Sequence, residues 1–304
     1  MNEFIKTHFV FFLIASMLLG FFVPGPFAIF ANLVVPILAC IMISSFLSID
    51  FAVLKKRLSR PKDIIIVFVI VKIIIPAGLY FIIKPFDPVI ALAILLISAA
   101  PAAAVSPTFT KLCRGDMEFA LVVLMITSVL SPITLPLTIN LLAGTNIDID
   151  IWGMVKTLLQ IIVIPFVATL VLKRFCSKSI EKVKPYLGSF AVIALAILLL
   201  GLVANGAADI KSNYALFPKF TLVSCLLGIY LALAGWFFFL FFNREKRIAL
   251  SLSTSYINVG LIIVLSSRFF PIEVMIFTLI YEIPANILPG IIKWLCNKKS
   301  NQVL

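Results

Sequence analysis

The hydrophobic positions of the chain form ten long apolar stretches, which short polar or proline- and glycine-containing segments separate. Each stretch has roughly 17–25 residues, the length that a helix needs to cross a hydrocarbon layer about 30 Å thick. We therefore predict an all-α membrane protein with ten transmembrane helices. The expected spans are 6–23, 27–47, 63–84, 88–110, 117–142, 151–173, 186–206, 217–242, 248–267 and 271–293.

Composition supports this interpretation and restricts the function classes. Hydrophobic residues make up 62% of the 304 positions and charged residues only 12%, against about 25% charged residues in soluble domains. A soluble protein of this length could not bury so much apolar surface, whereas lipid covers it in a membrane protein. We predict a multi-pass protein of the cell (inner) membrane, with the lipid bilayer as its surroundings.

Lysine and arginine alternate between the loops. The N-terminus, the even-numbered loops and the C-terminus carry most of the 25 basic residues, and the other loops carry only Lys84, Lys211, Lys219 and Arg268. Basic loops stay on the cytoplasmic side, so both termini are predicted to be cytoplasmic. The same distribution explains the net charge of +12 without any nucleic-acid partner.

Residue types that bind metals are sparse. His8 is the only histidine, which excludes a multi-histidine metal site, and we predict no cofactor. Of the cysteines, those in basic segments are placed in the cytoplasm, where thiols stay reduced; these are Cys113, Cys176 and Cys296. No CxxC or other metal-ligand spacing occurs among the five cysteines, which are Cys40, Cys113, Cys176, Cys225 and Cys296.

Ten spans divide into two sets of five. With an odd number of spans in each set, the second set enters the membrane from the opposite side, which is the topology of an inverted repeat and a common transporter plan. We predict a first repeat over 1–145 and a second over 146–304. The prediction rests on the number and orientation of the spans, because the halves share no obvious sequence identity.

The fourth span contains a break signal. Its segment 98–107 reads SAAPAAAVSP, and Pro101 and Pro107 each remove a backbone donor and clash with a preceding carbonyl. Inside a membrane the freed carbonyls need partners from protein or trapped water. Two interpretations follow: a simple proline kink, or a discontinuous helix that offers backbone groups, together with Ser106, to a ligand.

The ninth span carries the densest polar cluster, SLSTSYINVG over 251–260. Ser253, Thr254 and Asn258 are candidate ligand-binding residues, although serine and threonine hydroxyls also bond to the carbonyl four residues earlier. Spans four and nine occupy corresponding places in the two halves. A matched pair of interrupted segments is typical of the midplane site of a transporter.

Two charged residues fall at membrane depth, Lys72 in span three and Glu282 in span ten. Each costs about 2.5–3.5 kcal/mol at mid-bilayer on insertion scales, and such residues usually face a cavity or a partner. Our hypothesis is that Lys72 and Glu282 line one cavity and pair there. A lysine that snorkels to the interface is the alternative for Lys72.

Several segments resemble the bile acid:sodium symporter family, within the bile acid/anion/auxin transporter superfamily. The stretch 44–62 and Pro76 look like that family, and so does 247–261, where Asn258, Gly260 and Leu261 match. The longest matching stretch falls in register without gaps; its matching residues are Pro101, Ser106, Arg114, Gly115, Asp116, Pro132 and Pro136.

The resemblance implies ten helices in two inverted repeats, with a panel part (spans 1, 2, 6 and 7) and a core part (spans 3–5 and 8–10). Broken helices four and nine would cross in the core. It also implies uptake of a small organic anion, often coupled to sodium.

The sequence departs from the family at the sodium ligands. Pro107 replaces an asparagine, and Ala120 and Leu124 replace hydroxyl residues. Ser253 and Ile257 replace a glutamate and a glutamine, so that only Ser106 clearly survives.

Our hypothesis for the coupling is that the ammonium of Lys72 takes the place of a missing cation, while Glu282 supplies a titratable carboxylate. It predicts proton-coupled transport or uniport, indifferent to sodium.

Other classes of membrane protein are alternatives to a transporter of this family. An auxin-carrier-like permease has the same topology, and an arsenite-exporter-like permease would carry a cysteine in span four, where this chain has Ala102, Ala103 and Ala104. A membrane enzyme is not supported, because no paired carboxylates, histidine site or activated nucleophile is found. A non-transporting membrane sensor or structural protein is the alternative from another class.

Overall fold

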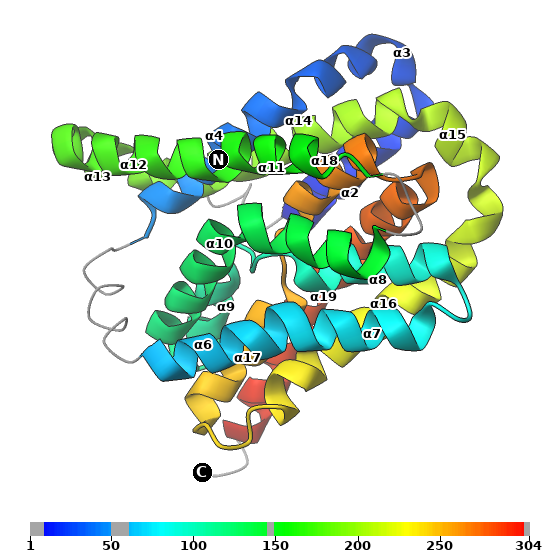
Figure 1. Ribbon diagram of the computed structural model, residues 1–304. Coiled ribbons are helices and arrows are strands. Elements are labelled where there is room, and N and C mark those ends of the chain that lie inside the picture. Colours follow the sequence, from blue (N-terminus) through cyan, green and yellow to red (C-terminus); the bar gives the residue numbers. More distant parts are fainter. Residues whose placement is uncertain (1–8, 50–60, 145–148, 301–304) are drawn as a thin grey trace. The chain divides into compact units, whose positions relative to one another are not determined.

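A computed structural model describes residues 9–49, 61–144 and 149–300 (Figure 1). Within these ranges the regular structure is helical, and the β-type pairing is an isolated antiparallel bridge between Ala102 and Ile257. The all-α prediction is therefore confirmed for the described residues. The basic run 55–57, the predicted repeat boundary at 145/146 and His8 lie outside them.

Seven helices of the described part are long and apolar enough to cross a membrane. Three further apolar helices are shorter, Val10–Phe22, Pro88–Ala99 and Val259–Phe269. The seven long ones are Pro24–Leu47, Lys62–Ile83, Met117–Ala143, Ile151–Phe175, Ser177–Asn205, Tyr214–Phe237 and Ile272–Trp294.

The chain forms two compact units. The first comprises, of the described residues, 9–49 and 152–214, and the second comprises 61–144, 149–151 and 215–300. The helices of the first unit are α2 (Phe9–Phe22), α3 (Pro24–Phe27), α4 (Val34–Leu47), α11 (Ile151–Leu158, of which Ile151 falls in the second unit), α12 (Ile164–Phe175), α13 (Ser177–Val183), α14 (Leu187–Asn205) and α15 (Ala207–Ser212). Those of the second unit are α6 (Pro61–Val69), α7 (Ile75–Ile83), α8 (Pro88–Ala99), α9 (Ser106–Leu112), α10 (Met117–Ala143), α16 (Phe217–Phe237), α17 (Arg244–Ser255), α18 (Val259–Phe269) and α19 (Ile272–Ser300).

In the first unit, α14 packs against α2, α4 and the 3-10 turn Ala28–Leu33. The contact is close because Gly201 lacks a side chain: a Cβ atom there would lie 2.8 Å from the backbone carbon of Phe30. Small residues allow helix backbones in membranes to approach in this way.

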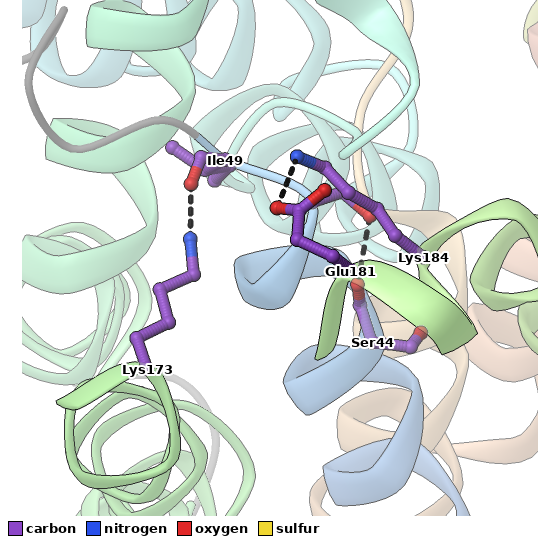
Figure 2. A network of polar contacts seen from close by, with 6 residues as sticks. Ser44, Ile49, Lys173, Glu181 and Lys184 are labelled. Carbon is purple, nitrogen blue, oxygen red and sulfur yellow. Dashed lines mark hydrogen bonds and ion pairs between the residues drawn. The ribbon is translucent and has the colours of Figure 1, made fainter. Parts of the chain in front are cut away.

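The end of α12 is tied to the chain that follows α4. Figure 2 shows the amine of Lys173 pointing to the carbonyl of Ile49, to which it donates a hydrogen bond. In the same view Lys184 pairs with Glu181 at 3.3 Å. Both contacts belong to the first unit, and each gives a lysine of a predicted cytoplasmic segment a local partner.

In the second unit, a π-helical turn, Ile70–Ile74, joins α6 to α7. Pro76 follows it, and a proline in a regular helix would clash with the carbonyl four residues earlier, which belongs to Lys72. A π turn inserts one extra residue and is frequent at functional sites. Lys72 lies within this turn and is buried.

An apolar cluster of the second unit joins α6, α10 and α17 through packed side chains that include Val67, Ala120 and Leu250. Ala120 is one of the positions where the resemblance would place a hydroxyl. Here it lies fully inside an aliphatic and aromatic cluster. The packing therefore fits an apolar residue at this position.

Candidate functional site

Two helices of the second unit are interrupted near their middle (Figure 1). The first interruption lies between α8, which ends at Ala99, and α9, which begins at Ser106. The second lies between α17, which ends at Ser255, and α18, which begins at Val259. Of the two interpretations of the fourth span, the geometry is that of a discontinuous helix.

The two interruptions pair with each other as short extended segments. The N–H of Ala103 donates to the carbonyl of Tyr256 at 2.8 Å, and the N–H of Asn258 donates to the carbonyl of Pro101 at 2.8 Å. An unpaired backbone group in an apolar interior is costly, and this pairing satisfies four of them. We call this pairing the helix crossing.

A threonine from α10 completes the donors of the helix crossing. The N–H of Ala102 donates to Oγ1 of Thr127 at 3.2 Å. Thr127 in turn donates to the carbonyl of Val123 at 2.7 Å, so its hydroxyl is used as both acceptor and donor.

Lys72 satisfies the acceptors at the end of α8. Its side-chain nitrogen donates to the carbonyl of Ala100 and, at 3.4 Å, to the carbonyl of Ser98. The lysine is only 3% exposed and reaches these groups from the π turn of the neighbouring helix. An amine donor therefore lies at the carboxyl end of a helix, where the unpaired carbonyls need a hydrogen-bond partner.

Glu282 is also buried and reaches the helix crossing through two other side chains. Asn286, one turn later on α19, donates to Oε1 of Glu282 at 2.9 Å and to its carbonyl at 2.7 Å. The hydroxyl of Tyr256 donates to Oδ1 of Asn286 at 3.1 Å. Glu282, Asn286 and Tyr256 thus form one hydrogen-bonded chain.

The predicted pairing of Lys72 with Glu282 was wrong for this conformation. Neither residue has the other as an ion-pair partner among the described side chains. The physical reason is local: the freed carbonyls of α8 lie within reach of the lysine, and the amide of Asn286 lies one turn from the carboxylate.

The predicted hydroxyls fall into two groups. Thr254 donates to the carbonyl of Leu250 at 2.6 Å, which is simple bonding within its own helix. Ser106 and Ser253 are 0% and 1% exposed, and among the described residues their hydroxyls have no hydrogen-bond partner. Buried hydroxyls without a hydrogen-bond partner are exceptional in folded proteins and call for an explanation.

The other predicted positions have mainly backbone roles. Pro107 is buried in the first turn of α9, where a missing N–H costs little. Asn258 caps α18 through Oδ1, which accepts from the N–H of Leu261 at 3.2 Å. Pro101 contributes its carbonyl to the helix crossing.

Sequence reasoning missed Thr127, Tyr256 and Asn286 as members of this network. Asn286 had a detectable signal, because it follows Glu282 by four residues on one helix face. Thr127 had none, since a threonine inside an apolar helix is normally bonded to its own backbone.

In the part of the chain that the structure describes, no three His, Cys, Asp or Glu side chains gather as a metal-binding group. The site instead offers hydroxyls, backbone groups, one amine and one carboxyl. Polar groups of this kind at paired helix interruptions are typical of the substrate site of a secondary transporter. The apolar helices and this site together define a polytopic membrane transporter.

Comparison with known proteins gives the family. The sequence profile of the sodium bile acid symporter family matches residues 35–213, which is more than half of the chain. This protein therefore belongs to the sodium bile acid symporter family, and the resemblance seen in the sequence is confirmed.

Three relatives illustrate the similarity. The protein YbaS of Bacillus subtilis (strain 168) is 25% identical over 268 residues, which cover 86% of this chain and 88% of the relative. The probable sodium/metabolite cotransporter BASS1 of Arabidopsis thaliana is 26% identical over 86% of this chain and 64% of its own length. The hepatic sodium/bile acid cotransporter of Rattus norvegicus is 26% identical over 83% and 72%.

Proposed function

We propose that this protein is a secondary transporter of a small organic anion whose transport does not depend on sodium. The observation that carries the proposal is the position of Lys72. Its amine donates hydrogen bonds to the carbonyls of Ala100 and Ser98 at the helix crossing. In this proposal a fixed cation stands where relatives named as sodium cotransporters would use a free one.

The proposed architecture has ten spans in two inverted repeats of five. The seven long and three shorter apolar helices of the described residues support this number. Segments α8–α9 and α17–α18 would be the broken fourth and ninth spans, and their antiparallel pairing agrees with an inverted relation. Both termini would lie in the cytoplasm and the protein in the cell (inner) membrane, as the distribution of basic residues predicts.

The proposed substrate class rests on the charge and donors around the helix crossing. The buried hydroxyls of Ser106 and Ser253 lack partners, and each can donate to a carboxylate or sulfonate oxygen. Lys72 supplies positive charge nearby in the same unit. The names of the relatives, which include sodium/metabolite and sodium/bile acid cotransporters, support an organic solute.

The proposed independence from sodium rests on the residues that stand where the family resemblance would place sodium ligands. Ala120 belongs to the apolar core, Leu124 is buried, and Ile257 contributes its backbone to the helix crossing. These side chains have no oxygen that could replace the water shell of a cation. Glu282 is then the carboxylate available for a proton, so that coupling is to protons or absent.

The test is uptake of labelled short-chain carboxylates and sulfonates into proteoliposomes. We expect accumulation to rise with an inward proton gradient and to stay the same when external sodium is replaced by choline. A strict sodium requirement contradicts the proposed coupling. Equal signals from protein-containing and empty vesicles for every anion contradict transport and favour a sensor or structural role.

The variant that isolates the central contact is Lys72→Met, which keeps the length of the side chain and removes its donor. We expect it to lower uptake and to destabilise the protein, because two carbonyls of α8 lose their buried partner. The matched control is Lys156→Met, since Lys156 lies exposed on α11. Unchanged uptake and stability of Lys72→Met would remove the basis of the proposal.

A further inference from the structure

Two cysteines meet at a place that the proposed transport site does not use. Cys113 directly follows α9 and is buried, and Cys296 lies near the end of α19 and is partly exposed. Both pack in one cluster with Ile248 and Leu252. The thiol of Cys296 is close enough to influence the ionisation of the Cys113 thiol.

The backbone around Cys113 is held in one conformation. The N–H of Arg114 donates to the carbonyl of Lys111 at 3.0 Å, and the N–H of Gly115 donates to that of Thr110 at 2.8 Å. Arg114 has a φ of 58°, in the left-handed region. These features form a Schellman motif, which ends α9 and keeps the thiol of Cys113 in place against α19.

The surroundings separate the roles of the two sulfurs. The neighbouring Cys296 thiol, followed by burial, raises the pKa of the Cys113 thiol. Cys113 is buried and Cys296 is partly exposed, so a peroxide from solution reaches the sulfur of Cys296 first. Lys293 lies one turn before Cys296, and its charge acts in the opposite direction, lowering the pKa of Cys113.

We propose that Cys113 and Cys296 are a redox modification site, where a peroxide oxidises the two thiols to a reversible disulfide. The Cys296 thiolate attacks one oxygen of the peroxide, and an S–O bond forms as the O–O bond breaks. Hydroxide leaves, and Cys296 becomes a sulfenic acid. The Cys113 sulfur then attacks the sulfenic sulfur, the S–O bond breaks, and water leaves with the proton of Cys113. Each sulfur loses one electron, and the peroxide takes up both.

The location suits a switch rather than a permanent crosslink. Both cysteines belong to segments that the charge distribution assigns to the cytoplasm, where thiols are reduced and disulfides are transient. The bond would connect α9, which begins at Ser106, with α19, which carries Glu282. Oxidation would thus fasten two elements of the second unit that approach the helix crossing.

The test treats the purified full-length protein with hydrogen peroxide and then digests it for mass spectrometry. We expect a linked pair of peptides that contains Cys113 and Cys296 and is lighter by two hydrogens than the reduced peptides together. The midpoint of thermal unfolding should rise by about 5–10 °C, because the bond joins segments far apart in the sequence. Dithiothreitol should reverse both changes.

Two variants and one internal reference complete the experiment. Cys296→Ser replaces the more exposed thiol, so it is expected to fold, and it should abolish both the linked peptide and the thermal shift. Cys113→Ser should do the same and leave Cys296 open to further oxidation. The exposed lone thiol of Cys176 reports general oxidation.

A disulfide of either cysteine with Cys176, a link between two protein copies, or conversion of Cys296 to a sulfinic acid without any linked peptide would overturn the proposal. The linked peptide and the unfolding midpoint do not depend on transport, so their outcome is independent of the proposed function.

Discussion

The hydroxyl of Tyr256 donates to Oδ1 of Asn286 at 3.1 Å, and this one contact joins the buried carboxyl of Glu282 to the helix crossing. Tyr256 takes part in the crossing itself, since its carbonyl accepts from the N–H of Ala103. Any change in the hydrogen bonding of Glu282 can therefore reach the backbone pairing through only two side chains.

The contact of Tyr256 with Asn286 should be visible as an energetic coupling. We expect Tyr256→Phe and Asn286→Leu each to destabilise the protein, and the double variant to lose less than the sum, with a coupling of about 0.5–3 kcal/mol. Thermal or denaturant unfolding in detergent measures it. As a control, Tyr256→Phe and Thr134→Val, whose hydroxyls have different hydrogen-bond partners, should be additive. Additivity in the first pair would contradict the contact of Tyr256 with Asn286.

Thr127 should be required for the stability of the helix crossing. In Thr127→Val the N–H of Ala102 loses its acceptor and is left buried, at a cost of about 1–3 kcal/mol in the free energy of unfolding. Thr134→Val is the control on the same helix, because that hydroxyl donates to the carbonyl of Leu130 on the exposed side. Equal stability of the two variants would show that Ala102 finds another partner.

Gly235 should tolerate no side chain, because α16 and α17 touch there. A Cβ atom at Gly235 would lie 2.5 Å from the carbonyl oxygen of Leu250 and 2.7 Å from Cα of Ser251, and neither backbone atom can move aside. We expect Gly235→Ala to cost about 1–3 kcal/mol and to weaken the hydrogen bond from Ser251 to the carbonyl of Ala232, now 2.8 Å.

The control for the Gly235 variant is Gly78→Ala. Gly78 lies inside α7 and has open space around an added Cβ. Alanine is the better helix former, so this variant should gain up to about 1 kcal/mol. Opposite shifts in the unfolding midpoint are therefore expected, and a loss of stability in both variants would point to a general intolerance of helix substitutions.

The ion pair of Asp87 with Lys219 should give a stability difference that depends on pH. Burial by itself raises the pKa of Asp87, but the hydrogen bond from the N–H of Ile90 and the contact with Lys219 outweigh it and hold the pKa below its ordinary value. A lowered pKa in the folded state means that the stabilisation is complete above the ordinary value of about 3.9 and is lost as pH falls through the folded value.

Asp87→Asn tests this dependence, since asparagine is an equally good N-cap for α8 and only the charge is removed. We expect the wild-type protein to unfold at a higher temperature than the variant at neutral pH, and the two to converge below pH 4. Because Lys219 is 57% exposed, the difference should be below about 1 kcal/mol. Glu181→Gln, at a pair on the surface of α13, should change less; a difference that persists in acid would contradict the assignment.

The sequence located the helix interruptions because their signals are local. Pro101 ends α8 by lacking a donor, and Asn258 caps α18 with its own side chain. The partners across the interruptions were not predictable in the same way. Lys72 was expected to meet a carboxylate, yet it meets carbonyls that become available only once α8 stops at Ala99.

The spacing of Lys72 and Pro76 is a sequence signal for the orientation of Lys72. Pro76 follows it by four residues, and this spacing places the lysine carbonyl where the proline ring would clash in a regular helix. The structure resolves the clash with the π turn that contains Lys72. A helical wheel with a constant 100° step cannot represent such a turn, because the extra residue rotates every position that follows it.

The amine at the carbonyl of Ala100 belongs to the chain and is never released. Whatever movement it makes in one half of a turnover it reverses in the other, so it contributes no net displacement of charge. In the proposed uniport, each anion would then cross as an uncompensated negative charge. A voltage that is negative inside the cell opposes its entry and assists its exit by about 2.3 kcal/mol for every 100 mV. A proton taken up with the anion would cancel this electrical cost, and current recordings on planar bilayers distinguish the two cases directly.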